Sequence, residues 1–109
     1  MTVLIENVIA AVKQHQDSFK QPLLHWLSFP DNQRIWRCFE HEANKVWDEG
    51  RRHYAARTIC EYIRHETRLA EADILFKISN NIIPDLAQLY LILYPERQGF
   101  FSIRRGMAA

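Results

Sequence analysis

The sequence predicts a mainly helical domain of the α+β class, with about five helices and one small two-stranded β-hairpin. Glycine and proline are scarce, three and four residues among 109, whereas an all-β fold needs turn residues roughly every eight to twelve positions. Apolar residues also recur at the three- and four-residue steps of a helix. A chain of this length can bury one core. We expect a single domain over 1–109, with a helical segment at 1–30 and a helical core with the hairpin at 31–105.

The first thirty residues predict two helices. Apolar residues repeat with helical spacing over 2–18. Pro22 is suited to open a short second helix, and Pro30 ends it because the residue before a proline avoids the helical conformation. This third either packs on the rest of the domain or leaves an apolar surface for a partner or a second copy. Aromatic side chains dominate such interfaces, and the candidate anchors are Trp26, Phe29 and Trp36.

Two longer amphipathic helices follow. We expect the first to begin at a cap formed by Asp31 or Asn32 and to end at Gly50 in a left-handed conformation. Its polar residues, Glu40 among them, are assigned to the solvated face. The next helix is expected over 55–70, after a basic and aromatic connection with the sequence Arg51-Arg52-His53-Tyr54.

The spacing of the apolar residues changes around residues 74–84, from a continuous strand-like run to a helical repeat. An apolar run at 74–78 predicts a short strand that pairs antiparallel with a second strand at 100–104. Between them a nearly all-apolar helix at 82–94 is expected to lie at the centre of the domain. Asn80 and Asn81 are interpreted as its turn and cap. The alternative is that these amides contact a ligand, since amides can bind adenine edges and a helix amino terminus favours phosphate.

The sequence gives no sign of catalysis or metal binding. The five histidines are 10 to 16 residues apart, so no pair has the close helical spacing of a zinc site. There is no glycine-rich phosphate loop and no nucleophile elbow. We therefore expect no enzyme activity, cofactor or metal. Cys38 and Cys60 are expected to be reduced and buried, with a disulfide left open.

No apolar run reaches the roughly 20 residues that span a bilayer, and no secretory leader is evident. We expect a soluble protein of the cytoplasm. The net charge is +1, with five Lys/Arg against seven Asp/Glu in residues 1–49 and nine against six in residues 50–109. A small basic excess in the second half could bind nucleic acid or an acidic partner. Its candidate residues are Arg51, Arg52, Arg57, Arg64, Arg68, Lys77, Asn80, Asn81 and Arg104. Otherwise these cations form a solvated face neutralised by nearby glutamates.

Three segments carry a resemblance: RRHYAARTICEYIRHET, FKISNNIIPDLAQLYLILYPE and GFFSIRR. Together they resemble a small family of uncharacterised proteins from bacterial and phage genomes, over about residues 44–105. Ser79, Gln88 and Ser102 stand where that family usually has other residues. The resemblance implies a compact unit around the asparagine turn and an origin in a mobile element, without an established activity.

The sequence therefore leaves two candidate functions. The first is a non-enzymatic protein-interaction protein, such as a phage-encoded inhibitor or adaptor that docks on a larger host complex, with self-association to a dimer as one form. The alternative is a small nucleic-acid-binding module, similar to a winged helix, that uses the basic residues against phosphates.

Overall fold

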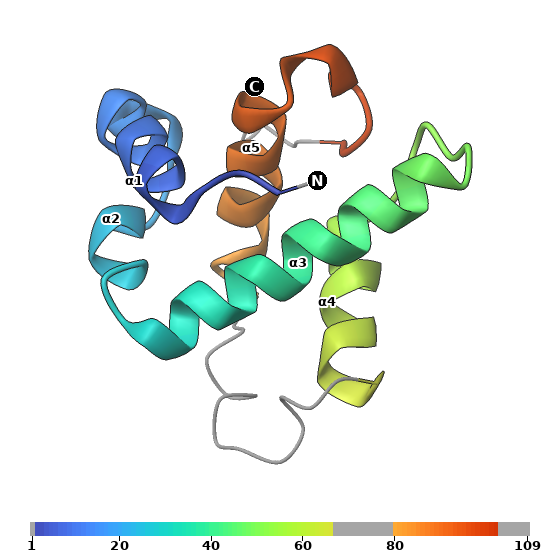
Figure 1. Ribbon diagram of the computed structural model, residues 1–109, viewed down its shortest axis with the longest axis horizontal. Coiled ribbons are helices and arrows are strands. Elements are labelled where there is room, and N and C mark those ends of the chain that lie inside the picture. Colours follow the sequence, from blue (N-terminus) through green and yellow to red (C-terminus); the bar gives the residue numbers. More distant parts are fainter. Residues whose placement is uncertain (1, 67–79, 103–109) are drawn as a thin grey trace.

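Five α-helices and two short 3-10 helices make up the residues that this computed structural model describes, 2–66 and 80–102 (Figure 1). In chain order they are α1 (Ile5–Gln14), η1 (Gln16–Ser18), α2 (Leu23–Trp26), α3 (Pro30–Asp48), α4 (Ala56–Glu66), α5 (Ile83–Leu93) and η4 (Pro95–Arg97). The mainly helical class and the five predicted helices are confirmed. No helix in this part of the chain is long and apolar enough to cross a membrane.

Helix α5 lies at the centre, as its apolar composition predicts. It packs against α1, α3, α4 and η4, behind α3 and between α1 and α4 in Figure 1. Leu86, Leu89 and Tyr90 are fully buried. A helix surrounded in this way has no solvated face, which explains why its sequence is apolar on nearly every side.

The first third of the chain packs onto the same core. Val8 and Val12 of α1 and Leu23 and Leu27 around α2 are buried in one cluster with the residues of α3 and α5. Of the three proposed anchors, Trp36 is fully buried and stacks on Phe39, with ring centroids 5.8 Å apart. Trp36 is therefore a core residue, and only Trp26 and Phe29 remain at the surface.

Two predicted caps are wrong. Helix α3 begins one residue before Asp31, at Pro30, and extended Phe29 is its N-cap residue, with no side-chain hydrogen bond. Proline suits the first position because its missing N–H has no helical partner there. Likewise Ile82 precedes α5 without a side-chain cap, while Asn80 and Asn81 lie exposed in the turn before it. Gly50 does adopt the predicted left-handed conformation, with φ of +97°.

The predicted β-hairpin is not supported. Residues 74–78 lie outside the described ranges, and within those ranges there is no strand. Phe101 instead forms an isolated parallel bridge with Tyr54, and the Tyr54 N–H donates to the Phe100 carbonyl at 2.8 Å. Phe100 and Phe101 are both buried, whereas successive residues of a strand point to opposite faces. This segment therefore fills the core beside the α3–α4 loop.

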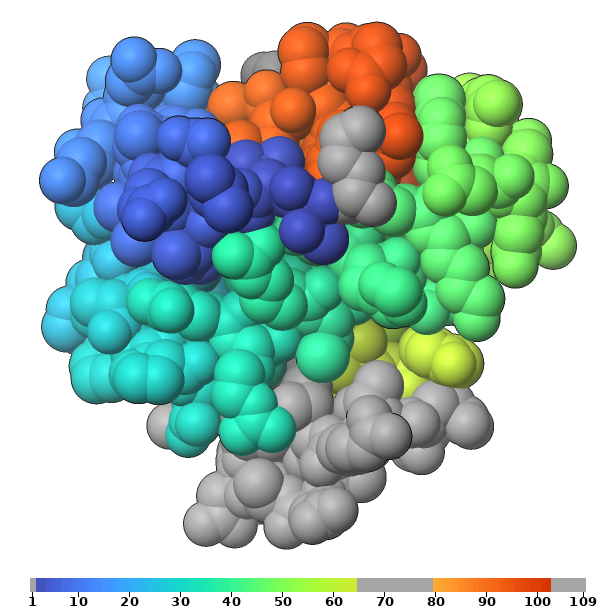
Figure 2. All heavy atoms as spheres, viewed as in Figure 1, coloured from blue at the N-terminus to red at the C-terminus, as the bar shows by residue number. Residues whose placement is uncertain are grey.

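A buried polar network joins the amino-terminal segment to α3 and α5. Glu40, assigned from the sequence to the solvated face, is fully buried. Its Oε2 accepts from the Val3 N–H at 3.0 Å and from the Tyr94 hydroxyl at 2.8 Å. Arg37 lies 3.5 Å from the other carboxylate oxygen and donates to the Val3 carbonyl at 2.6 Å. Figure 2 shows the amino-terminal segment, in blue, lying on the surface of α3.

The network continues toward η4. Asn44 Oδ1 accepts from the Tyr90 hydroxyl at 2.6 Å and from Arg97 Nη1 at 2.8 Å, and Asn44 Nδ2 donates to the Tyr94 hydroxyl at 3.2 Å. Because these groups are hydrogen-bonded, burying them between α3 and α5 costs little and fixes how the two helices pack.

A second buried carboxylate fixes the chain between η1 and α2. Asp85, in the first turn of α5, is 2% exposed and accepts from the backbone N–H groups of Lys20 and Gln21 at 2.9 and 2.8 Å. These donors are on a segment 64 and 65 residues away. The position of α2 therefore depends on α5.

Replacing Glu40 with alanine should destabilise the fold strongly. The Val3 N–H, the Tyr94 hydroxyl and Arg37 would lose a charged acceptor inside the core, and such losses cost about 3 kcal/mol or more. Glu49→Ala is the matched control, because this exposed residue lies at the end of the same helix and should change the unfolding free energy by less than about 0.5 kcal/mol. Urea unfolding measures both, and equal losses would contradict the role given to Glu40.

Candidate functional site

The surface is hollowed between α2, the start of α3 and the turn before α5. The groove has a volume of about 200 Å³. Seven residues line it: Gln21, Pro22, His25, Trp26, Phe29, Asn32 and Ile82. Two of the three aromatic anchors predicted from the sequence, Trp26 and Phe29, are thus brought together at one site.

Local chemistry explains the shape of this groove. Phe29 is extended, with ψ of 131°, because Pro30 follows it, and the chain therefore turns sharply between α2 and α3. Asn32 Nδ2 donates to the Trp26 carbonyl and Gln33 Nε2 to the Leu27 carbonyl, each at 2.9 Å. These bonds satisfy the Leu27 carbonyl and add to the 3.4 Å bond that the Trp26 carbonyl accepts from the Phe29 N–H at the carboxyl end of α2.

The lining is apolar and neutral apart from a few polar groups. Phe29 is 46% exposed, and the His25 ring meets its ring edge to face with centroids 5.2 Å apart. Asn32 is 5% exposed, and its Oδ1 is buried with no hydrogen-bond partner among the described residues. None of the seven lining residues is an aspartate, glutamate, lysine or arginine, so an uncharged occupant fits this groove best.

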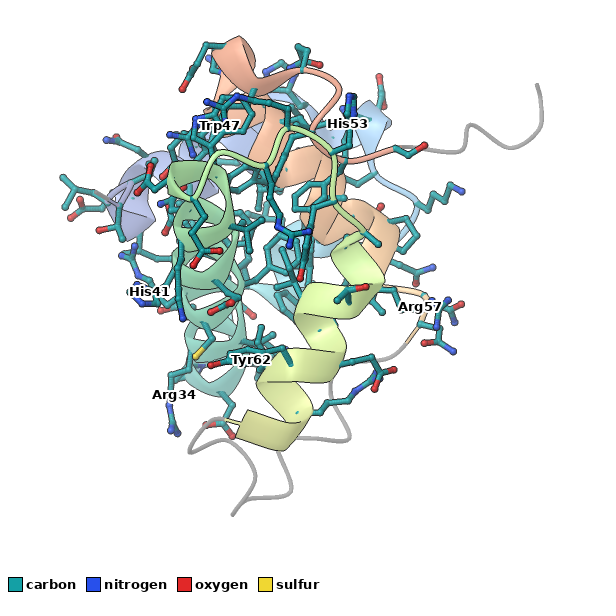
Figure 3. All side chains as sticks on the ribbon, turned by 90° about the vertical axis from the view of Figure 1, so that its right-hand side faces the viewer. Arg34, His41, Trp47, His53, Arg57 and Tyr62 are labelled. Carbon is teal, nitrogen blue, oxygen red and sulfur yellow. The ribbon has the colours of Figure 1, made fainter. Side chains whose placement is uncertain are left out.

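The predicted basic residues do not gather at one place among the residues that the structure describes. Arg57 Nη1 donates to Asn80 Oδ1 at 3.1 Å, and Arg64 pairs with Glu61 at 2.9 Å. Figure 3 places Arg57 on the flank of α4 away from α3, with Trp47 and His53 at the upper end of the view. Asn81 is exposed beside Asn80. Three further candidates lie outside the described residues: Arg68, Lys77 and Arg104.

Arg51 and Arg52 form a separate group with aromatic rings, which we call the arginine–aromatic cluster. Its members are Trp47, Arg51, Arg52, Tyr54 and Arg97. The Cζ atoms of Arg52 and Arg97 lie 4.0 and 4.9 Å from the centroid of the Trp47 ring, and that of Arg51 lies 5.7 Å from the Tyr54 ring. Each such contact attracts a cation to the ring face.

Arg97 is the member that sequence reasoning missed. The segment around it reads as a plain turn, and its partners lie far away along the chain: Trp47 by 50 residues and Asn44 by 53. No spacing rule connects residues at that distance. The basic and aromatic run from Arg51 to Tyr54 was the only visible signal for this cluster.

Neither described cysteine has the properties of a catalytic nucleophile. Both are free thiols, Cys38 half-buried and Cys60 buried. Burial raises the pKa of Cys38, and it raises the pKa of Cys60 from 9.0 to about 12. A thiol becomes reactive when its pKa is lowered. In addition, no group of three His, Cys, Asp or Glu side chains within 2–66 and 80–102 is placed to hold a metal ion.

The two thiols should therefore differ in their reaction with a disulfide reagent at pH 8. We expect native Cys38 to react slowly and Cys60 to react only after denaturation, because Cys60 is buried and protonated. Cys38→Ala and Cys60→Ala variants assign each kinetic phase. Rapid modification of Cys60 in the folded protein would contradict this burial.

Alkaline pH should destabilise the fold through Tyr94. Burial raises its pKa from 10.0 to about 12, and the hydrogen bond to Glu40 acts in the same direction. The unfolded chain loses this proton near pH 10 while the folded protein holds it to about pH 12. The stability linked to the protonated hydroxyl is thus complete below pH 10 and is lost between these values. Denaturant unfolding at pH 8 and 11 measures this loss. The unfolding free energy should decline less between the two pH values in Tyr94→Phe than in the control Tyr62→Phe, because Tyr62 is 40% exposed. Equal declines would refute the role of Tyr94.

Comparisons with known proteins leave the site to be interpreted from its own chemistry. No protein-family model, curated protein or solved structure matches the chain. The resemblance to a family of phage and bacterial proteins therefore stays a prediction. The groove and the arginine–aromatic cluster, at opposite ends of α3, are the two surfaces on which a function can be argued.

Proposed function

We propose that this protein is a non-enzymatic protein-interaction module whose groove between α2 and α3 takes one bulky uncharged side chain from a partner protein. It is best understood as an inhibitor or adaptor encoded by a phage or other mobile element, docking on a larger complex in the cytoplasm. The observation that carries the proposal is the meeting of Trp26 and exposed Phe29 at one open groove.

The size of the groove favours a side chain over a small-molecule ligand. Sites for cofactors and drug-sized ligands have volumes of roughly 300–1,000 Å³, whereas this groove holds about 200 Å³. A single aromatic or large aliphatic side chain fits such a space. Interfaces concentrate their binding energy in anchors of this kind, inserted into desolvated pockets.

The surroundings also suit a protein partner. The half-exposed Phe29 ring would gain on the order of 2 kcal/mol if a partner covered it. The backbone around the groove is fixed by the bonds of Asn32, Gln33 and Asp85. A rigid groove loses little conformational entropy when a partner binds.

The alternative function, nucleic-acid binding, receives less support. Among the described candidates, Arg57 and Arg64 lie on α4, where they are bonded to Asn80 and Glu61. Arg51 and Arg52 lie on the α3–α4 loop and contact aromatic rings. A phosphate backbone would need several converging cations, and the net charge of the chain is only +1.

Peptide display tests the proposal even though the partner is unidentified. Random peptides selected on the folded protein should share one bulky apolar residue. Their affinity should fall at least tenfold for Phe29→Glu, which places a charge at the neutral groove, and should change less than twofold for Leu4→Glu. Leu4 is the matched control because it is 64% exposed and does not line the groove.

Three outcomes would reject the groove as the docking site. The first is the absence of any enriched peptide motif. The second is equal binding of the selected peptides to both variants. The third is a groove that binds a small molecule and no peptide. Light scattering adds a further arm: a dimer that Phe29→Glu alone dissociates would make a second copy of the chain the occupant, against the proposed foreign partner.

A further inference from the structure

The α3–α4 loop presents two arginines that have no counter-ion within the described ranges. Arg51 and Arg52 are exposed, and neither forms an ion pair with any residue of the described part of the chain. Arg97, the third guanidinium of the arginine–aromatic cluster, pairs with Glu96 at 3.4 Å and is largely buried. The two loop arginines are therefore the cations of this cluster that an external anion can reach.

The Arg52 guanidinium is held in a fixed position. Its Nη1 donates to the carbonyls of Trp47 and Arg51 at 2.9 and 3.2 Å, and its Cζ lies 4.0 Å from the centroid of the Trp47 ring. That ring is itself packed edge to face on Phe100, with centroids 5.4 Å apart. The Nε and Nη2 groups of Arg52 form no hydrogen bond to a described residue, and they are the edge that can bind an anion in two places.

The loop that carries both arginines is also fixed. The Tyr54 N–H donates to the Phe100 carbonyl at 2.8 Å, and His53 Nδ1 lies 3.1 Å from the Gly99 carbonyl. In Figure 3, Trp47 and His53 lie together at this end of the molecule. Because the loop backbone and the Arg52 guanidinium need little further ordering, most of the interaction energy of Arg52 is available for binding.

We propose that Arg51 and Arg52 form a binding site for carboxylate side chains of an acidic protein segment. Arginine binds a carboxylate through two parallel hydrogen bonds, and its planar group stays stacked on an aromatic ring while doing so. The site is small, with two accessible guanidinium groups. It suits one or two carboxylates.

Neighbouring acidic residues favour a peptide over a nucleic acid. Asp48 and Glu49 directly precede the loop and are exposed, and Glu96 is 63% exposed beside Arg97. A nucleic-acid strand carries a charge at about every 3.4 Å and would pass these carboxylates, whereas a peptide can place single carboxylates only at the arginines. The Trp47 ring, already in contact with Arg52, Arg97 and Phe100, is also poorly placed to stack a base.

This site is independent of the groove. Asn32 and Trp47 are 15 residues apart on α3, which corresponds to about 22 Å along the helix. The carboxylate site can therefore be present whether or not the groove binds a partner. Phe29→Glu should leave it unchanged.

Nuclear magnetic resonance of the full chain tests the site with defined probes. A peptide with one pair of carboxylates, Gly-Gly-Glu-Glu-Gly-Gly, should shift the Nε–H signals of Arg51 and Arg52 and the Trp47 indole signal, and Gly-Gly-Gln-Gln-Gly-Gly should not. The variant Arg51→Gln/Arg52→Gln should weaken binding of the glutamate peptide at least tenfold. Lys13→Gln/Arg34→Gln removes the same charge at exposed positions and should weaken it less than twofold.

A charge-preserving variant separates geometry from charge. Arg51→Lys/Arg52→Lys should weaken binding at least threefold, because lysine lacks the planar guanidinium that donates two parallel hydrogen bonds to one carboxylate. The assignment is overturned if the glutamate peptide causes no shift, if the control variant loses as much affinity, or if the lysine variant binds equally well. It is also overturned if a hexathymidine oligonucleotide binds more tightly than the peptide through the same arginines, since the partner would then be a nucleic acid.

Discussion

The fold depends on one buried carboxylate. Glu40 is fully buried in the middle of α3, and it binds the amino-terminal segment through the Val3 N–H and the end of α5 through the Tyr94 hydroxyl. Burying a charge costs free energy unless hydrogen-bond donors or an opposite charge contact it. Three separate segments must therefore meet at Glu40 together, and this requirement sets how α3 and α5 cross.

Two separate sets of buried polar contacts, the Glu40 network and Asp85, position the two candidate sites. From Tyr94 the Glu40 network passes through Asn44 and Tyr90 to Arg97, which also lies over Trp47. Arg97 thereby connects the core to the arginine–aromatic cluster. At the other end of α3 the groove depends on Asp85 of α5, which fixes Lys20 and Gln21. Both surfaces are rigid because each is attached to the central helix by charge-assisted hydrogen bonds.

Prediction from the sequence succeeded for features that depend on residues within one helix. The period of the apolar residues predicted the four longer helices, and Pro22 and Pro30 predicted the short α2. Gly50 marked the end of α3 because few other residues adopt its φ of +97°. Prediction failed where distant segments compete. Residues 100–104 are predicted as a strand, yet Phe100 is buried against Trp47, Tyr54 and Tyr90. Phe101 is buried against Phe39 and Tyr90. Local propensity for a strand yields when an aromatic pair can bury both its rings.

The sequence by itself determined the helical class, the central place of residues 83–93, and the aromatic and basic residues from which a site could be built. Only the tertiary structure decided that Trp36 belongs to the core while Trp26 and Phe29 share a groove, that Glu40 is buried, and that Arg97 lies over Trp47. Helical periodicity is a property of neighbours within a turn or two. The burial of a polar side chain depends on donors that lie 37 to 54 residues away, and no local pattern encodes that distance.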